Sequence, residues 1–180
     1  MAYVDQPLGD FLALVAEPTP APGGGAVAAV TASLAAGLVA MAGPENPDLV
    51  DSLGRRAAAL ADEDATAYSE VIQARRTGAS VTDAMARATE VPLEIAATAA
   101  EIARCAAEVF LTGRPSVRGD VATALLLAEG ATRSAAYLVE VNVEAGGGTR
   151  DLVDRARAHI AAARVARELA GGRAPVPAEH

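Results

Sequence analysis

Three polar residues, Asp64, Asp120 and Asn142, interrupt or punctuate an otherwise apolar helical pattern. Asp64 fills a gap in a stripe of apolar residues that recur every three or four positions. A carboxylate on a buried stripe loses its hydration, which raises its pKa toward the range useful for general acid and base chemistry. Asp64 is therefore the best catalytic candidate by pattern. The alternatives are an ion pair with an arginine, or rotation to solvent beside Asp62 and Glu63.

The remaining polar residues have plainer interpretations. Asp120 is most simply the N-terminal cap of a helix, although it could also take part in chemistry. Asn142 is the next position on the apolar stripe of that helix, so a register residue and a ligand-binding residue are equally compatible with it. Thr132 is expected to bond back to its own helix, His159 to pack partly buried without a nucleophile to serve, and Cys105 to be a small core residue.

A proline-rich and glycine-rich turn precedes the most apolar part of the chain. Residues 18–22 alternate proline with other residues and end at Pro22, which excludes a helix there. Gly23, Gly24 and Gly25 follow, and the lack of a Cβ lets their backbone approach another surface closely. Free N–H groups at the start of a helix also attract anions and carbonyl oxygens. The alternative is a tight turn with close helix packing.

Composition excludes several classes of protein. The 180 residues carry a net charge of −8 with a pI near 4.7, which argues against nucleic-acid and anionic-membrane partners. All 15 basic residues are arginine, so neither a nucleotide P-loop nor a lysine Schiff base can form. The single cysteine forms no internal disulfide, no cluster has the spacing of metal ligands, and no signal peptide is apparent. We therefore expect a cytoplasmic protein without a metal.

Residues 26–43 are apolar enough to resemble a membrane span. They are mostly alanine, short for a bilayer, and flanked by no basic anchors. The composition favours a core helix that its neighbours shield on all sides.

The spacing of apolar residues predicts an all-α bundle of about six helices that would hold the polar candidates. Residues 1–170 form one domain in this interpretation, and 171–180 a flexible C-terminal tail. The predicted helices run from Asp5 to before Pro18, from the glycine turn to about Ala42, from Asn46 to about Arg76, from Ser80 past Val109 with a kink near Pro92, from near Asp120 to before Ala145, and from Thr149 to about Ala170.

Two further expectations concern which side chains face inward. Leu8, Phe11, Leu12 and Val15 form the apolar face of the first helix, and Leu169 is an inward position of the last.

Residues 112–119 contain enough glycine and proline to predict a turn of about eight residues.

The motifs, taken in order, resemble those of the cyclodeaminase/cyclohydrolase family. This family comprises the C-terminal domain of formiminotransferase-cyclodeaminase and free-standing methenyltetrahydrofolate cyclohydrolases. The resemblance covers roughly residues 8–145, and its order and spacing make it more specific than any single motif. The segments that carry it are Pro18 to Ala29, Asp64 to Tyr68, Ala88 to Ala96, Gly119 to Ala124, and Val141-Asn142.

The resemblance implies a multi-helix bundle, usually a homodimer, that acts on N5- and N10-substituted tetrahydrofolate. The reaction would be either cyclodeamination of 5-formiminotetrahydrofolate to 5,10-methenyltetrahydrofolate or hydrolysis of the latter to 10-formyltetrahydrofolate, with no cofactor beyond the folate itself. The alternative is a non-catalytic folate-binding or helical interaction protein that keeps the fold. The residues implied are Asp64 and Asp120 for catalysis and Pro22, Gly23, Gly24, Gly25 and Asn142 for substrate binding.

Overall fold

A computed structural model describes residues 2–171, and these residues contain helices and no strands, which confirms the all-α prediction. Two short 3₁₀ turns, Tyr3–Asp5 and Pro115–Val117, accompany the helices. The six α-helices are α1 (Leu8–Ala16), α2 (Gly24–Ala42), α3 (Pro47–Thr77), α4 (Val81–Thr112), α5 (Arg118–Glu144) and α6 (Arg150–Gly171). The predicted C-terminal tail lies outside the described residues, except for Gly171.

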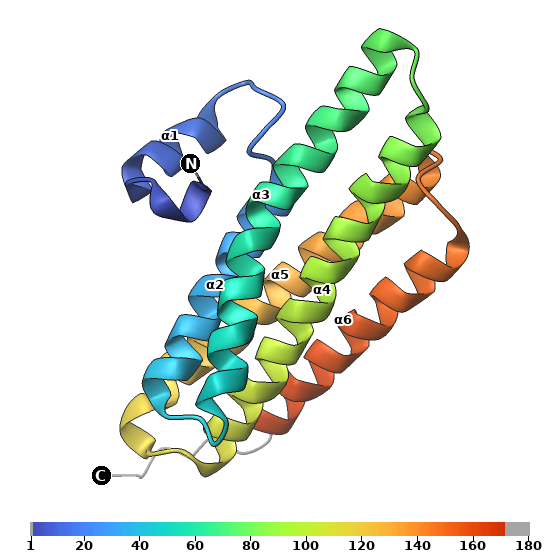
Figure 1. The fold of residues 1–180 in the computed structure, drawn as a ribbon. Coiled ribbons are helices and arrows are strands. Elements are labelled where there is room, and N and C mark those ends of the chain that lie inside the picture. The colour runs from blue at the N-terminus through green and yellow to red at the C-terminus, as the bar shows by residue number, and fades with distance from the viewer. Residues whose placement is uncertain (1, 172–180) are drawn as a thin grey trace.

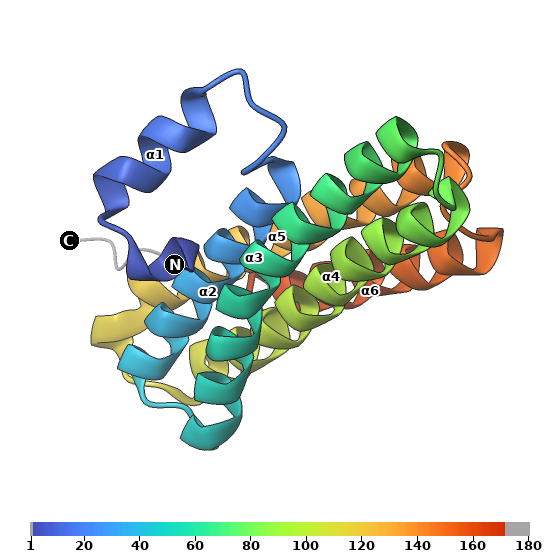
Figure 2. The same cartoon turned by 45° about the horizontal axis from the view of Figure 1, so that its top comes forward.

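The five long helices, α2 to α6, lie side by side and form the bundle (Figure 1). Helix α4 packs against α2, α3, α5 and α6, so it is the central element of the bundle. Helix α1 stands apart from the long helices in both ribbon views and joins α2 through the proline-rich segment (Figure 2).

Small side chains let these helices pack closely. The core is mostly alanine, and its largest fully buried side chains include Leu60, Ile95 and Ile102. A Cβ added to Gly54 of α3 would lie 3.2 Å from the Cβ of Ala36 on α2, which shows how near the two backbones come. The bundle therefore gains its stability from close backbone approach rather than from large aromatic side chains.

Side-chain caps begin two of the helices where the sequence predicts them. The Asn46 side chain accepts a hydrogen bond from the Leu49 N–H at 3.1 Å, and Ser80 Oγ accepts one from the Asp83 N–H at 3.3 Å.

The start of α5 differs from the prediction. This helix begins at Arg118 and its N-cap residue is Val117, which makes no side-chain cap. Asp120 lies in the first turn instead, so its interpretation as the cap is wrong. The 3₁₀ turn Pro115–Val117 runs directly into α5, so the non-helical segment is shorter than the eight residues predicted.

Two expectations about inward-facing residues were also wrong. Of the predicted apolar face of α1 only Phe11 is buried, whereas Leu8, Leu12 and Val15 are exposed because α1 has no bundle helix packed over that face. Leu169 is 59% exposed. The buried stripe of α6 ends at Ala166 and Ala170, and Leu169 points to the side of it.

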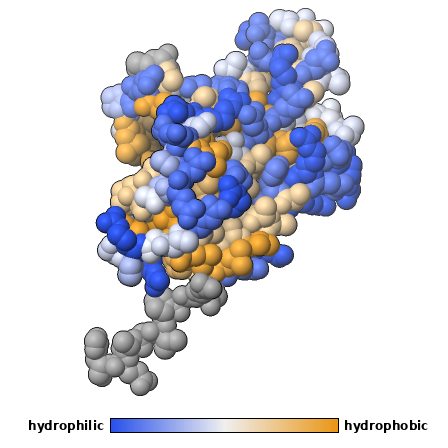
Figure 3. Space-filling view, turned by 60° about the horizontal axis from the view of Figure 1, so that its bottom comes forward, coloured by the Kyte–Doolittle hydropathy of each residue, from blue (hydrophilic) through white to orange (hydrophobic). Residues whose placement is uncertain are grey.

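Helix α2 is long and apolar enough to cross a membrane by length and composition alone, and half of its apolar window is buried within the bundle. Its expected complete shielding is wrong, because Leu34 is 60% and Met41 53% exposed. Hydrophobic surface also gathers on the lower part of the face drawn in Figure 3, next to hydrophilic surface.

Three plainer interpretations are confirmed. The Thr132 hydroxyl is buried and donates to the carbonyl of Ala128 at 2.8 Å, one turn earlier. Cys105 is buried, and that burial raises the pKa of its thiol. His159 is half-buried, which lowers the pKa of its imidazole.

Candidate functional site

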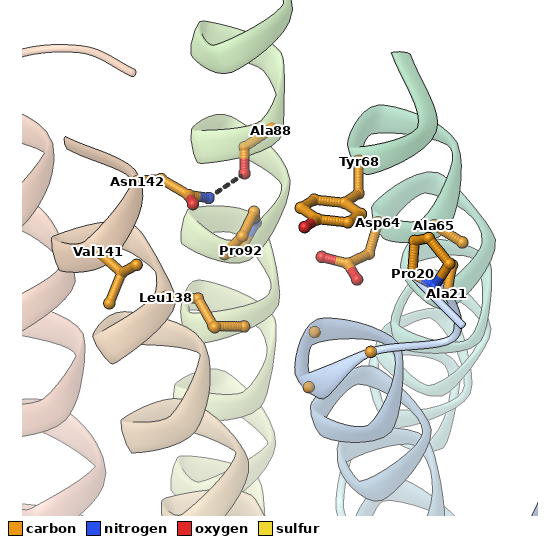
Figure 4. A pocket seen from close by; sticks show the side chains of 13 residues that line it. Pro20, Ala21, Asp64, Ala65, Tyr68, Ala88, Pro92, Leu138, Val141 and Asn142 are labelled. Carbon is orange, nitrogen blue, oxygen red and sulfur yellow. Dashed lines mark hydrogen bonds between the residues drawn. The ribbon is translucent and has the colours of Figure 1, made fainter. Parts of the chain in front are cut away.

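One pocket joins most of the residues that the sequence singles out. It measures about 250 Å³ and lies where the proline-rich segment and the start of α2 meet α3, α4 and the C-terminal part of α5 (Figure 4). A pocket that holds a complete drug-sized ligand measures roughly 300 to 1,000 Å³, so this one has room for part of such a ligand. Its lining consists of Pro20, Ala21, Gly23, Gly24, Gly25, Asp64, Ala65, Tyr68, Ala88, Pro92, Leu138, Val141 and Asn142.

The carboxylate of Asp64 closes the N-terminal end of α2. Its Oδ2 accepts a hydrogen bond of 3.0 Å from the backbone N–H of Ala26, the third residue of that helix. The N-cap residue Gly23 has no side chain with which to cap the helix. Asp64 on α3 therefore satisfies a free donor of α2 and places its negative charge at the positive end of the helix dipole.

Gly25 makes this contact possible. A Cβ at Gly25 would lie 2.5 Å from Oδ2 of Asp64 and closer still to its Oδ1 and Cγ, far inside van der Waals contact. Gly23 and Gly24 are different, since a Cβ on either would meet its nearest neighbour at 3.8 or 3.9 Å. The close approach expected of the three glycines is therefore required at Gly25.

Burial raises the pKa of the Asp64 carboxyl, and the hydrogen bond from Ala26 offsets part of that rise.

Among residues 2–171, Asp64 neither pairs with an arginine nor turns to solvent beside Asp62 and Glu63, so neither alternative interpretation describes its environment. Asp62 accepts a hydrogen bond from the Tyr3 N–H at 3.0 Å, and Glu63 pairs with Arg56. Asp64 has no arginine partner among the described residues and is only half-exposed, so its carboxyl faces the pocket as a proton acceptor of raised basicity.

Asn142 reaches the pocket from α5 and is tied to α4. Its Nδ2 donates a hydrogen bond of 2.6 Å to the backbone carbonyl of Ala88 (Figure 4). In a regular helix that carbonyl would accept from residue 92, but Pro92 has no N–H. The Asn142 side chain thus replaces the missing helical hydrogen bond.

The glycine turn after α5 anchors the same residue through its backbone. The N–H of Gly147 donates to the carbonyl of Asn142 at 2.8 Å. Gly147 is buried, and a Cβ there would lie 2.8 Å from the carbonyl oxygen of Met85 and closer still to Thr89 Oγ1. Backbone contact with α4 therefore holds the C-terminal end of α5 in place beside the pocket.

Tyr68 and Leu138 line the pocket although sequence reasoning gave neither a role. Tyr68 lies one helical turn after Asp64, so both side chains share a face of α3, and its ring stands near the carboxylate in Figure 4. Leu138 precedes Asn142 by the same spacing on α5. The signal for both was available, because residues four apart in a helix lie on one face.

Two predicted site residues do not line the pocket. Pro22 is buried and is not among the lining residues. Asp120 lies 22 residues before Asn142 on α5, which corresponds to about 33 Å along a helix that rises 1.5 Å per residue. Within one chain, therefore, Asp120 and Asp64 do not form a pair of carboxylates.

Electrostatically the pocket is simple. Asp64 is the one charged residue in its lining, and the rest is mainly backbone, proline and aliphatic carbon. Within residues 2–171 no group of three or more histidine, cysteine, aspartate or glutamate side chains could hold a metal ion. The arrangement can accept a proton beside an apolar wall and can bind a ligand group that offers N–H donors or positive charge.

Fold and site together define an all-α bundle protein with one proton-accepting carboxylate in an apolar pocket. The chain belongs to the formiminotransferase-cyclodeaminase family, whose model matches residues 7–44 and 46–162. The fold is similar to the crystal structure of formiminotetrahydrofolate cyclodeaminase from Thermotoga maritima, with a TM-score of 0.86 and 19% sequence identity over 93% of this chain and 94% of that one. No curated protein sequence matches the chain.

Proposed function

We propose that this protein is a folate enzyme that converts 5-formiminotetrahydrofolate to 5,10-methenyltetrahydrofolate with release of ammonia. Family membership supports the folate substrate. The single observation that carries the proposal is the carboxyl of Asp64, whose pKa is raised by burial, facing an apolar pocket that contains no other charged group. Such a group suits a substrate whose reacting part is cationic and must exchange protons.

Proton transfer is the main demand of this reaction. N10 attacks the formimino carbon on N5, and a tetrahedral carbon forms between the two nitrogens. N10 then has to lose its proton, and the amine has to gain one before the carbon–nitrogen bond to ammonia breaks. The ionised Asp64 carboxylate accepts the proton from N10 and then donates it to the amine. Because the carboxylate ends as it began, the substrate amidinium and the methenyl product carry the same single positive charge.

The pocket would bind the reacting part of the folate. Its lining is apolar apart from a few groups, and its volume matches part of a drug-sized ligand. The ring of Tyr68 and the side chains of Leu138 and Pro92 offer apolar contact. The glutamate end of the folate would then lie outside, away from the Asp64 charge that would repel it.

Hydrolysis of the methenyl bridge is the second candidate, because Asp64 is only half-buried and water can reach it. In that reaction the carboxylate would accept a proton from the attacking water and pass it to N5 as the N5–carbon bond breaks. The second water proton leaves to solvent as the formyl carbonyl forms, and this gives neutral 10-formyltetrahydrofolate.

The test mixes purified protein separately with 5-formiminotetrahydrofolate and with 5,10-methenyltetrahydrofolate and follows the methenyl chromophore against a protein-free control. A gain of absorbance in the first reaction supports the deaminase, and accelerated loss in the second supports the hydrolase. If neither rate changes while the protein is folded and both substrates are intact, the enzyme proposal is wrong and a binding or interaction protein is favoured.

We further propose that two copies associate through the uncovered apolar face of α2. Helix α2 contains no charged residue, whereas the chain carries a net charge of −8 that opposes association through its other surfaces. Leu34 and Met41 are exposed on α2, and Leu126 and Tyr137 on the adjacent helix α5. A second copy of this chain would cover such a face, since large apolar side chains grouped on the surface favour protein contacts.

A further inference from the structure

A proline in the middle of α4 leaves one backbone carbonyl without its helical donor. Pro92 is fully buried at this point, so water is a poor substitute for that donor. The Ala88 carbonyl instead accepts from Nδ2 of Asn142, 54 residues later in the chain. A buried carbonyl without a hydrogen-bond donor lowers the stability of the folded protein. The bond between Asn142 and Ala88 therefore stabilises the packing of α5 on α4.

The same bond decides which way the Asn142 amide faces. A carbonyl oxygen can only accept, so the NH₂ group of Asn142 has to face Ala88, and its oxygen cannot. No hydrogen bond to Oδ1 is formed within the described part of the chain, and Asn142 lines the pocket. Oδ1 is therefore left as an oriented acceptor at the pocket.

We propose that Pro92 is a positioning residue for Asn142. Because Pro92 has no N–H, the Ala88 carbonyl is free to accept the hydrogen bond from Asn142 Nδ2. That bond fixes Asn142 Oδ1 as an acceptor for a ligand N–H group. Together with the Asp64 carboxylate, the pocket then presents two acceptors and no cation among its lining residues. The ligand group that fits is rich in N–H donors, as a reduced pterin is. The choice of a folate as probe rests on the proposed function. The effect of Pro92 on the orientation of Asn142, called the relay below, does not.

The relay can be tested in the free protein by a double-mutant cycle of Pro92→Ala and Asn142→Ala. In the wild-type background, Asn142→Ala leaves the Ala88 carbonyl without a hydrogen-bond donor and should raise the unfolding equilibrium constant about tenfold or more. In the Pro92→Ala background the restored N–H serves that carbonyl, so the same change should have an effect several-fold smaller. Equal effects in both backgrounds would overturn the proposal.

Asn46→Ala is the matched control, because Asn46 is the N-cap of α3 and lies outside the pocket. Its loss should raise the unfolding constant about fivefold, independently of the residue at position 92. A second readout is the NMR signal of the Asn142 side-chain NH₂, assigned by its disappearance in Asn142→Ala. Pro92→Ala should shift this signal and speed its hydrogen exchange, and an unchanged signal would contradict the relay.

Ligand binding tests the last step with tetrahydrofolate, which offers N–H donors and carries no one-carbon group to react. We expect Asn142→Ala and Pro92→Ala each to weaken binding about fivefold, although Pro92→Ala restores a helical hydrogen bond and should not destabilise the fold. Unchanged affinity in both variants would overturn the acceptor role. If the wild-type protein does not bind tetrahydrofolate, the proposed function fails while the stability cycle still decides the relay.

Discussion

The carboxylate of Asp64 occupies the space in which a Cβ of Gly25 would stand, with Oδ2 2.5 Å from that position and Oδ1 closer still. Oδ2 also accepts the Ala26 N–H at 3.0 Å, so the turn before α2 and the middle of α3 are shaped around one another. This relationship explains why a glycine turn and a half-buried aspartate occur in the same chain. It also gives the carboxyl both an anchor and a face open to the pocket.

Gly25→Ala should separate the geometry of the site from the stability of the helix. The new methyl group would displace the Asp64 carboxylate, and we expect turnover to fall about 100-fold, since a displacement of about 1 Å can have that effect. The measurement is kcat/KM with the folate substrate that the wild-type protein converts. Gly9→Ala is the control, because Gly9 lies on α1, outside the pocket and outside α2, with nothing within 4 Å of its added Cβ. Equal activity in the two variants would contradict the account.

The raised pKa of Asp64 predicts how stability depends on pH. Because the folded-state pKa lies above the ordinary value of 3.8, the native protein favours the protonated carboxyl. Its ionisation therefore lowers the free energy of unfolding as the pH rises through the raised pKa, and this penalty is absent below about 3.8. Asp64→Asn keeps an acceptor for Ala26 and removes the charge, so it should be at least as stable as wild type at pH 7.

Urea unfolding of Asp64→Asn and wild type at several pH values checks this prediction. The stability difference in favour of the variant should shrink as the pH falls toward 3.8. A variant that is less stable than wild type at pH 7 by more than about 1 kcal/mol would show that the ionised carboxylate stabilises α2 more than its burial opposes it.

Asp120→Asn should retain nearly all wild-type activity if the site is contained in one chain. Asp120 is exposed and lies about 33 Å from Asn142 along α5. The measurement is kcat/KM beside that of wild type, with circular dichroism as a control for folding. A loss of 100-fold or more would mean that a partner subunit brings its Asp120 to this pocket, and the single-chain account of the site would then be wrong.

Leu34→Glu should dissociate the proposed dimer. A charge in the centre of an apolar, uncharged helix face cannot be paired there, and we expect monomers at micromolar concentrations with the helical signal intact. Light scattering coupled to size exclusion gives the mass directly. Ala158→Glu on α6 is a control at an exposed position outside α2, α5 and the pocket. A wild-type protein that is itself monomeric would refute the dimer.

Much of the fold can be read from apolar spacing, because bundle helices bury one stripe each. Most apolar residues at this spacing in α3, α4 and α5 are buried, including Val50, Ile95 and Val139. Leu53 and Val81, which share the spacing, are only partly buried. Spacing fails at Leu12, where no helix of the bundle packs over the apolar face of α1, and at Leu169, which lies beside the buried stripe of α6. An amphipathic pattern identifies a face but not the surface that covers it.

The candidate site is predictable to a smaller extent. Asp64 and Asn142 interrupt apolar stripes, and that signal leads to the pocket. Asp120, to which only the family resemblance gave a catalytic role, lies at the opposite end of α5 from Asn142. Residue types on one helix do not reveal which end a pocket occupies. The bond between Asn142 and Ala88 joins residues 54 positions apart. Pro92 signals a free carbonyl at Ala88, but only the packing of α5 on α4 supplies its donor.

The most direct test of the central claim is the turnover of Asp64→Asn on the folate substrate that wild type converts. General acid and base catalysis contributes roughly 100- to 10,000-fold, so kcat should fall by that factor while the protein remains folded and still binds tetrahydrofolate. Asp62→Asn, two residues away and outside the pocket lining, should keep its activity. Wild-type turnover by Asp64→Asn would contradict the assignment of proton transfer to this carboxyl.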